Sequence, residues 1–272
     1  MWRRYIYYII GSICLMLVSC DHIAESDRLY DSIIESKEGQ EDDTPETVKR
    51  VVLLEDFTGQ KCINCPNATN EIELIQEVFG DKVAAVAIHG GSNGFSGNAN
   101  LVGLATETAK EYYNKWGLGN TQPIGMVNRH EPIIYQEWSA TVKKELEKSV
   151  TLRLEGTAAL ADNTITIQIK AEGINGTTTG KLQVWLIEDG IKAFQKMPDG
   201  TLNYDYIHNH VFRTAVNGIW GEDISIEEGK TVKRTFTQTL ETNWNKEQLS
   251  IVAFVYNDSG VQQAAKFKVT TP

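Results

Sequence analysis

Residues 51–67 decide the fold of this chain and read Val-Val-Leu-Leu-Glu-Asp-Phe-Thr-Gly-Gln-Lys-Cys-Ile-Asn-Cys-Pro-Asn. The first seven residues are mostly apolar, which predicts a central strand that is covered on both faces. A polar turn leads to Cys62 and Cys65, and apolar residues then recur at helical spacing from Ala68 to Phe79. The Cys-x-x-Cys pair is therefore predicted at the N-terminus of a helix, where unpaired N–H groups and the helix dipole favour a thiolate.

This position favours a reactive thiol at Cys62. Lowering the pKa of a thiol from about 8.5 to about 7 takes roughly 2 kcal/mol. An exposed helix dipole supplies about 0.3–1 kcal/mol, and a partly buried one supplies up to about 2 kcal/mol. Lys61, immediately before Cys62, adds a positive charge. We therefore expect Cys62 to be a working nucleophile if the site is partly shielded from water.

The first 19 residues are predicted to be a lipoprotein signal peptide. Two arginines precede an apolar stretch, Tyr5–Val18, that is too short to span a bilayer comfortably. The stretch ends in Leu17-Val18-Ser19-Cys20, which resembles the lipobox of bacterial lipoproteins. Such a motif implies cleavage before Cys20 and acylation of that residue, which holds the protein on a membrane. The alternative is an ordinary signal peptide, or a short anchor, with an incidental cysteine.

Cysteine usage then points to redox chemistry. Of the four cysteines, Cys14 leaves with the signal peptide and Cys20 carries lipid, so Cys62 and Cys65 remain as thiols. They lie beyond the inner membrane, where disulfides form and persist. Two thiols cannot form a disulfide scaffold, and they supply at most half of a structural zinc site. A redox pair that needs no cofactor is the simplest interpretation.

The negative charge is concentrated in one segment. Without the signal peptide the chain has 24 basic and 36 acidic residues, a net charge of −12, and residues 21–47 account for −8 of it with ten acidic and two basic residues. This composition predicts an acidic, solvated tether over residues 20–47. The remainder is near −4. No basic footprint for nucleic acid is present, so we expect no nucleic-acid partner.

Residues 48–149 are predicted to form one α/β domain. The motif helix is followed by a second buried strand, Lys82–His89, which a crossover of this length places parallel to the first. A loop rich in Gly, Asn and Ser spans residues 90–103, and either connects elements or contacts a substrate. Pro123 opens the next strand and is a candidate for a cis peptide bond. The remaining elements are a helix with Ala105, Ala109, Tyr112 and Trp116 on one face, a strand at Ile124–Asn128, a short strand at Ile133–Tyr135 and a helix at Glu137–Leu146.

The order β-α-β-α-β-β-α, with Cys-x-x-Cys at the first helix and proline before the third strand, resembles the thioredoxin fold. In that family an Asp-Phe pair stands before the first cysteine at the spacing that Asp56 and Phe57 have here. The resemblance implies that Cys62 is the attacking thiol and Cys65 the resolving thiol. It also implies that Asp56 is the buried proton acceptor for Cys65, and that Pro123 is the cis-proline that aligns the substrate backbone.

Residues 150–272 are predicted to form an all-β domain. The hydrophobic period changes to two, and turn signals such as Asn175-Gly176 and Glu228-Gly229 separate the segments. Short strands at this spacing, with no further helix pattern, predict an antiparallel sandwich of the immunoglobulin-like kind. The expected strands are Thr151–Leu154, Thr164–Ile169, Gln183–Ile187, Thr231–Gln238, Leu249–Val255 and Gln262–Val269.

A long connection, Gly190–Asp223, carries most of the remaining chemistry of this domain. His208 and His210 are two residues apart, so on a strand they would face the same side and share a metal ion. They are weak candidates because no third ligand is evident, and we expect no metal site. The aromatic side chains of this connection are expected to cover one end of the sandwich or to pack against the first domain.

The combination of lipobox, acidic tether, thioredoxin-like motif and a sandwich bearing His208-Asn209-His210-Val211-Phe212-Arg213 resembles one known group. This is the Bacteroidetes outer-membrane lipoprotein family named for a twenty-eight-kilodalton outer-membrane protein. The resemblance implies a location in the cell envelope, at the outer membrane and facing the periplasm or the surface. It implies an architecture but no reaction.

Two functions follow from the sequence. The first is thiol–disulfide exchange, through Cys62, on protein thiols or disulfides of the envelope. The second is a non-catalytic surface binding or structural lipoprotein in which Cys62 and Cys65 form a static disulfide. Lys61 and Ile63-Asn64 depart from the residues usual in thioredoxins, so the redox direction and the substrate are not fixed. The sequence gives no indication of the oligomeric state.

Overall fold

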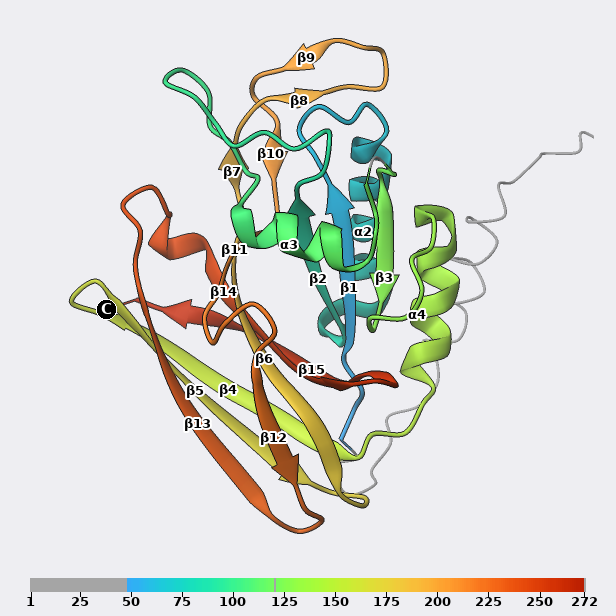
Figure 1. Cartoon of the computed structure of the whole chain (residues 1–272), viewed down its shortest axis with the longest axis vertical. Helices are drawn as coiled ribbons and strands as arrows, with labels where there is room; N and C mark the ends of the chain where they lie inside the picture. The colour runs from blue at the N-terminus through green and yellow to red at the C-terminus, as the bar shows by residue number, and fades with distance from the viewer. Residues whose placement is uncertain (1–47, 120, 272) are drawn as a thin grey trace, which may run out of the picture.

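A computed structural model describes residues 48–119 and 121–271 (Figure 1). The predicted signal peptide, Cys20 and the tether therefore lie outside the described residues. Within them, a mixed α/β region is followed by a largely β region, as the hydrophobic periods predict. None of the helices in the described part of the chain has the length and apolar character needed to cross a membrane.

The α/β region is built on strand β1 (Val52–Thr58), in which all seven residues are buried. Helix α2 (Cys65–Phe79) and the 3-10 turn η1 (Gly80–Lys82) cross over to β2 (Val83–His89), which pairs with β1 in parallel. Strand β3 (Ile124–Val127) lies antiparallel on the other side of β1. The predicted strand near Ile133 is a single bridge to Gly125.

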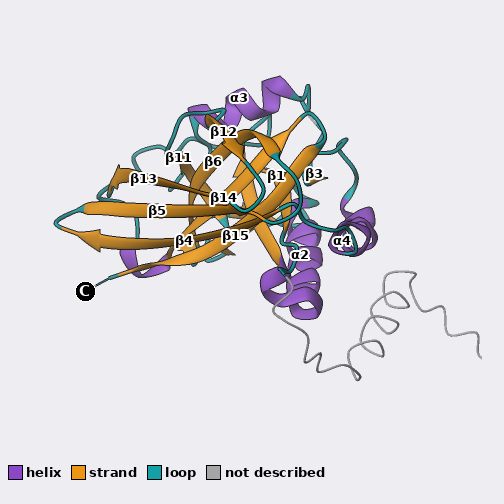
Figure 2. Cartoon of the chain, turned by 90° about the horizontal axis from the view of Figure 1, so that it is seen from below, coloured by secondary structure: helices purple, strands orange, loops and turns teal. Residues whose placement is uncertain are grey.

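Helices cover both faces of this sheet because neighbouring residues of β1 point to opposite sides. On one face, α2 and α4 (Trp138–Leu146), which follows the 3-10 turn η2 (Tyr135–Glu137), pack against Val52 and Leu54. On the other face, α3 (Glu107–Lys115) packs against Leu53 and Phe57. Figure 2 shows α3 on the opposite side of the strands from α2 and α4.

The β region contains the six predicted strands, and each of them is longer than the alternation indicates. All neighbouring pairs among them are antiparallel except β15 and β4, which pair in parallel at two positions. A core of Leu, Ile, Val and Ala side chains fills the space between β4–β5 and β6–β14. The strands are β4 (Leu152–Ala161), β5 (Thr164–Gly173), β6 (Thr178–Glu188), β13 (Thr231–Thr239), β14 (Leu249–Asn257), which follows the 3-10 turn η3 (Lys246–Gln248), and β15 (Gly260–Thr270).

The long connection after β6 forms additional strands. Strand β11 (Val211–Ala215) pairs with β6 on one side and with β2 on the other, so one sheet with the order β13-β5-β4-β15-β14-β6-β11-β2-β1-β3 runs through both regions. Strand β12 (Glu222–Ile226) also pairs with β6. The two small hairpins pair β7 (Ile191–Lys192) with β10 (Ile207–His208), and β8 (Gln195–Lys196) with β9 (Leu202–Asn203).

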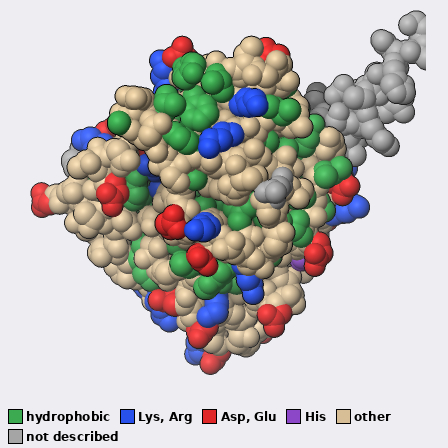
Figure 3. All heavy atoms as spheres, turned by 45° about the horizontal axis from the view of Figure 1, so that its top comes forward, with side chains coloured by type: hydrophobic (Ala, Val, Ile, Leu, Met, Phe, Trp, Pro, Cys, Tyr) green, Lys and Arg blue, Asp and Glu red, His purple; other side chains and the backbone are tan. Residues whose placement is uncertain are grey.

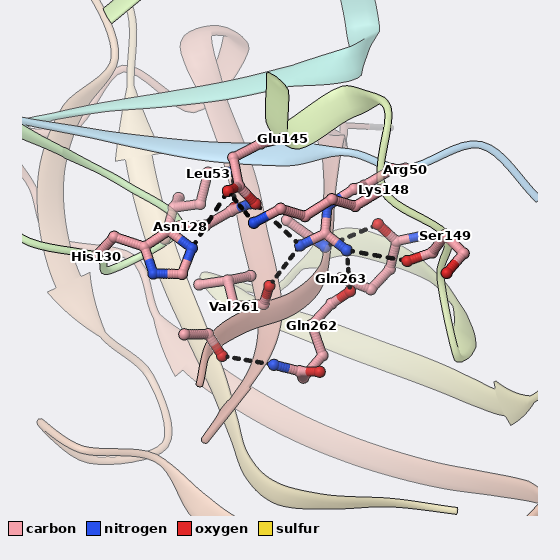
Figure 4. Close-up of polar contacts among 12 residues, drawn as sticks. Arg50, Leu53, Asn128, His130, Glu145, Lys148, Ser149, Val261, Gln262 and Gln263 are labelled. Atoms are coloured by element: carbon pink, nitrogen blue, oxygen red, sulfur yellow. Dashed lines mark hydrogen bonds and ion pairs between the residues drawn. The ribbon is translucent and has the colours of Figure 1, made fainter. Parts of the chain in front are cut away.

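The two regions also share side-chain contacts. Phe57 and Tyr112 belong to the same buried cluster as Trp185 and Phe254 of the β region. At the start of β1, the Arg50 guanidinium donates to the Val261 carbonyl at 2.9 Å and lies 3.4 Å from Glu145 of α4 (Figure 4). Glu145 also accepts hydrogen bonds from Asn128 and Lys148. The entrance to β1, helix α4 and strand β15 are therefore joined at one point.

Candidate functional site

Cys62 and Cys65 form a disulfide at the start of α2, as the position of the motif predicts. Their sulfur atoms are 2.22 Å apart and their Cα atoms 5.4 Å apart. Cys65 is the first residue of the helix, and Pro66 follows it. Proline at this position costs no hydrogen bond, because the first N–H groups of a helix have no intrahelical partner. The Cys62 N–H donates to the Gly59 carbonyl at 3.0 Å, which closes the turn before the helix.

Residues 191–208 and the loop 90–103 lie against the disulfide turn. Cys62 is 4% exposed and Cys65 is 2% exposed. The Gln195 side chain donates from Nε2 to the Cys62 carbonyl at 2.8 Å, and the Lys196 N–H donates to the Gln60 carbonyl at 2.8 Å. The turn is thus held by the segment 191–208, which contains β7 to β10. We call this segment the cover.

Gln60 joins the cover to the loop 90–103. It is fully buried, and its amide donates to the carbonyls of Val102 and Phe194 at 3.1 Å each. Its side-chain oxygen accepts from the Leu104 N–H at 2.9 Å. The sequence presents Gln60 only as part of a polar turn, and no local pattern marks it, because its partners lie up to 134 residues away.

Asp56 lies on the α2 face of β1, beneath Cys65. It is 1% exposed, and burial raises the pKa of its carboxyl to about 8. Its Oδ1 atom has no hydrogen-bond partner among the described residues. Asp56 and Cys65 line the same cavity of about 30 Å³, which has room for about one water molecule.

Three histidines, His89, His208 and His210, line this cavity as well. His89 and His208 meet edge to face, with ring centroids 5.2 Å apart. Burial lowers the pKa of His208 to about 4 and the pKa of His89 well below its ordinary value. Both rings are therefore neutral at pH 7. The sequence could have predicted that His89 lies near the cysteines. In the parallel pairing of β1 and β2, the last residue pair is Thr58 with His89, at the end of β1 where the turn to Cys62 begins.

His208 and His210 both line this cavity, but their rings have different partners. His210 lies beyond the end of β10 and has a positive φ of 58°, so the regular alternation of a strand does not extend to it. Its Nδ1 lies 2.9 Å from an Asp189 oxygen and its Nε2 lies 3.0 Å from the Gln76 side-chain oxygen. In residues 48–119 and 121–271 no three His, Cys, Asp or Glu side chains are placed to hold a metal ion.

Pro123 stands at the same end of the sheet as the disulfide. The Gln122–Pro123 peptide bond is cis. Ile124 pairs with Phe57, so Pro123 lies beside the end of β1, where the turn to Cys62 begins. The Gln122 amide donates to the Thr58 carbonyl at 2.7 Å and to the Gly90 carbonyl at 3.0 Å. The structure thus brings Asp56, the two cysteines and Pro123 to one end of β1.

Comparison with known proteins finds a match to a family of outer membrane proteins. The family described as "Outer membrane protein Omp28" matches residues 109–271, a span that begins in α3 and does not include Cys62 or Cys65. No curated protein matches the sequence.

Several solved structures are similar to the chain. HBP35 of Porphyromonas gingivalis is 14% identical over 83% of this chain and 77% of its own, with a TM-score of 0.65. Protein AGR_C_4864 from Agrobacterium tumefaciens is 16% identical over 84% of this chain and 97% of its own, with a TM-score of 0.51. These two similarities concern the fold alone. A domain of the outer membrane lipoprotein Omp28 from Porphyromonas gingivalis is 27% identical over 45% of this chain and 90% of its own, with a TM-score of 0.34.

Proposed function

Because this chain belongs to the Omp28 family of outer membrane proteins, we propose that it performs thiol–disulfide exchange on polypeptides at the outer membrane through Cys62 and Cys65. The observation that carries the proposal is the disulfide at the start of α2 with the carboxyl of Asp56 beneath it. Each of the two sulfurs, the acid and Pro123 then has a role in one reaction.

The reaction from the oxidised state is balanced as follows. A substrate thiolate attacks the Cys62 sulfur, the Cys62–Cys65 bond breaks, and Cys65 leaves as a thiolate. Asp56, whose pKa of about 8 keeps it mostly protonated at pH 7, supplies the proton that Cys65 takes up. A second substrate thiolate releases the substrate as a disulfide and leaves Cys62 reduced. The reverse sequence, starting from the dithiol, reduces a substrate disulfide.

We propose that residues 48–149 form a thioredoxin-like domain in which Pro123 aligns the substrate backbone. Its support is the parallel β1–α2–β2 unit, the antiparallel β3 and the position of the disulfide. Residues 150–272 are proposed to form an immunoglobulin-like sandwich. Its support is the antiparallel pairing of the long strands on both sides of one apolar core.

A polypeptide substrate is supported by the surface around the disulfide. Five large apolar side chains that are 41–56% exposed lie on the Cys62–Cys65 turn, the loop 90–103 and the cover. Figure 3, which brings this end of the molecule forward, shows hydrophobic side chains gathered on it. Surface of this kind favours contact with the apolar side chains of another chain. These side chains are Ile63, Val102, Leu202, Tyr204 and Ile207.

Burial of the disulfide supports the second function, a structural lipoprotein with a static disulfide. Since Cys62 is only 4% exposed, exchange with a polypeptide requires the cover to move away from the turn. A static disulfide requires no such motion. The two functions therefore differ in whether a protein thiol reaches Cys62 while the rest of the chain stays folded.

Trapping separates these functions. In a Cys65→Ser variant, exchange predicts mixed disulfides between Cys62 and envelope proteins, because the resolving thiol is absent. The matched Cys62→Ser variant is expected to trap none. A titration in glutathione buffers gives the reduction potential and hence the direction. If the native disulfide reacts only after unfolding in denaturant and neither variant traps a partner, the static function holds.

We propose that lipid on Cys20, which lies outside the described residues, anchors the protein. The support is the lipobox and membership of an outer membrane family. Mass spectrometry of the N-terminal peptide of the membrane-extracted protein is expected to find acyl chains on Cys20. A Cys20→Ser variant is expected to lose membrane association.

A further inference from the structure

A second cavity lies on the opposite face of β1, at the junction of the two regions. It has a volume of about 1090 Å³, close to the upper limit of the size range of small-molecule sites. The C-terminus of α3, strand β12 and the turn between β14 and β15 surround it. Its aromatic walls are Trp116, Trp220 and Tyr256, and Lys115 and Lys181 are also in its lining.

Arg129 belongs to the lining of this cavity. It follows β3, and its side chain is 5% exposed. The guanidinium carbon lies 4.2 Å from the centre of the Tyr256 ring and 4.6 Å from that of Phe254. The rings of Trp116 and Trp185 are each 5.3 Å away. These distances are those of cation–π contacts, so four rings surround one buried cation.

The hydrogen-bonding capacity of this cation is largely unused. Its Nε atom lies 3.4 Å from a Glu55 oxygen, whereas Nη1 and Nη2 are buried without a partner among the described residues. A guanidinium has five N–H donors, and buried donors in folded proteins are nearly always paired. Two unpaired donor atoms on a residue that lines a ligand-sized cavity point to an anion as ligand, because an anion is the usual partner of a guanidinium.

We propose that this cavity binds a small organic monocarboxylate with an aromatic body. The carboxylate pairs with the two Nη atoms of Arg129, and the body packs against Trp116 and Trp220. Tyr256, held by one hydrogen bond to the Trp220 carbonyl at 2.7 Å, turns aside to admit the carboxylate. This site is independent of the disulfide chemistry.

The charges around the cavity favour a single negative charge on the ligand. Its lining contains three cations and two carboxylates, Asp223 and Asp258. Asp223 already pairs with Lys181 at 2.7 Å, and Glu55 lies behind Arg129. A ligand with several negative charges would meet these carboxylates, whereas a monocarboxylate needs only Arg129.

The test compares 2-naphthoate with 2-naphthalenemethanol, which has the same rings but no charge. Calorimetry and quenching of tryptophan fluorescence on the whole protein are expected to show saturable binding of 2-naphthoate, at least about tenfold tighter than binding of the alcohol. The double variant Glu55→Gln, Arg129→Gln removes both buried charges together, so no unpaired charge remains. It is expected to reduce 2-naphthoate binding about tenfold and to leave binding of the alcohol unchanged.

Two further variants keep the test decisive if the double variant fails to fold. Trp220→Ser, in the cavity wall, is expected to weaken binding of both compounds. Lys110→Ala, on the same helix as Lys115 but outside the lining, is expected to change neither. Equal affinity for the acid and the alcohol, or no saturable binding of the acid at about 1 mM, would overturn the proposal.

Discussion

Glu55 and Asp56 are consecutive residues of β1, and both are buried, yet they lie in opposite surroundings. Asp56 faces α2 and a small cavity of about 30 Å³, and its carboxyl forms no ion pair with any residue that the structure describes. Glu55 faces the β region, where Arg129 lies 3.4 Å away beside an open cavity of about 1090 Å³. In both cases burial raises the pKa of the carboxyl, but at Glu55 the charge of Arg129 opposes the rise.

The difference shows how one strand serves two purposes. A buried acid without a partner stays protonated and is suited to transfer a proton. A buried acid with a cation stays paired and is suited to fix that cation in place. Because side chains alternate along a strand, a single step in the sequence changes which of these environments a carboxyl enters.

The largest expected effect comes from breaking the pair on the Glu55 face. Arg129→Met leaves the carboxyl of Glu55 buried without a cation, and we expect a loss of about 3–5 kcal/mol in the free energy of unfolding. Urea unfolding at pH 7 measures it. Adding Glu55→Gln to this variant is expected to restore most of the loss, because no buried charge then remains. A loss below about 1 kcal/mol in Arg129→Met would show that the pair is not what holds this face.

An effect of opposite sign is expected on the Asp56 face. The folded pKa of about 8 lies above the ordinary 3.8, so between these values the folded state binds one proton more than the unfolded state. The free energy of unfolding therefore falls as the pH rises from about 4 to about 8. Asp56→Asn removes this dependence and is expected to gain about 1–3 kcal/mol at about pH 5–6 and up to about 5 kcal/mol at pH 8, with no gain from this source below about pH 4.

Unfolding followed by tryptophan fluorescence across this pH range checks the prediction. Asp162→Asn, an exposed aspartate in the turn between β4 and β5, serves as the control and is expected to leave the pH dependence unchanged. The comparison between the two faces fails if Asp56→Asn destabilises the protein at pH 8.

The smallest effect concerns the closure of the Asp56 face. Gln195→Ala removes the hydrogen bond from the cover to the Cys62 carbonyl, at a cost of about 1 kcal/mol in stability. We expect reduction of the native disulfide by glutathione to become about fivefold faster, since about 1 kcal/mol corresponds to that change in the open population. Stopped-flow or alkylation assays measure the rate. An unchanged rate would mean that the cover does not limit access to Cys62.

Local patterns predict much of the α/β region. The mostly apolar run of β1, the helical spacing after Ala68 and the second apolar run each depend on neighbouring residues, so β1, α2 and β2 appear within a few residues of their true bounds. The placement of Asp56 and Pro123 near the cysteines follows from the resemblance to thioredoxin rather than from any local signal.

Contacts between segments that are distant in the sequence cannot be predicted from local patterns. Glu55 inside an apolar strand indicates a buried charge that needs a partner, but nothing in the sequence identifies Arg129, 74 residues later. Strand β11 has only five residues within a long connection, and its place is fixed by pairing with β6 and β2. Gln195 is equally unmarked, because its role depends on where the cover folds back.

Strand β11 excludes one kind of motion. It bonds along β6, and at its start Ala87 of β2 donates to the His210 carbonyl at 2.8 Å. A hinge motion that separates the two regions would break these main-chain hydrogen bonds and the aromatic contacts of the buried cluster that both regions share. The two regions therefore respond to an applied force as one rigid unit. Any motion that exposes the sulfur atoms of Cys62 and Cys65 has to be confined to the two small hairpins of the cover.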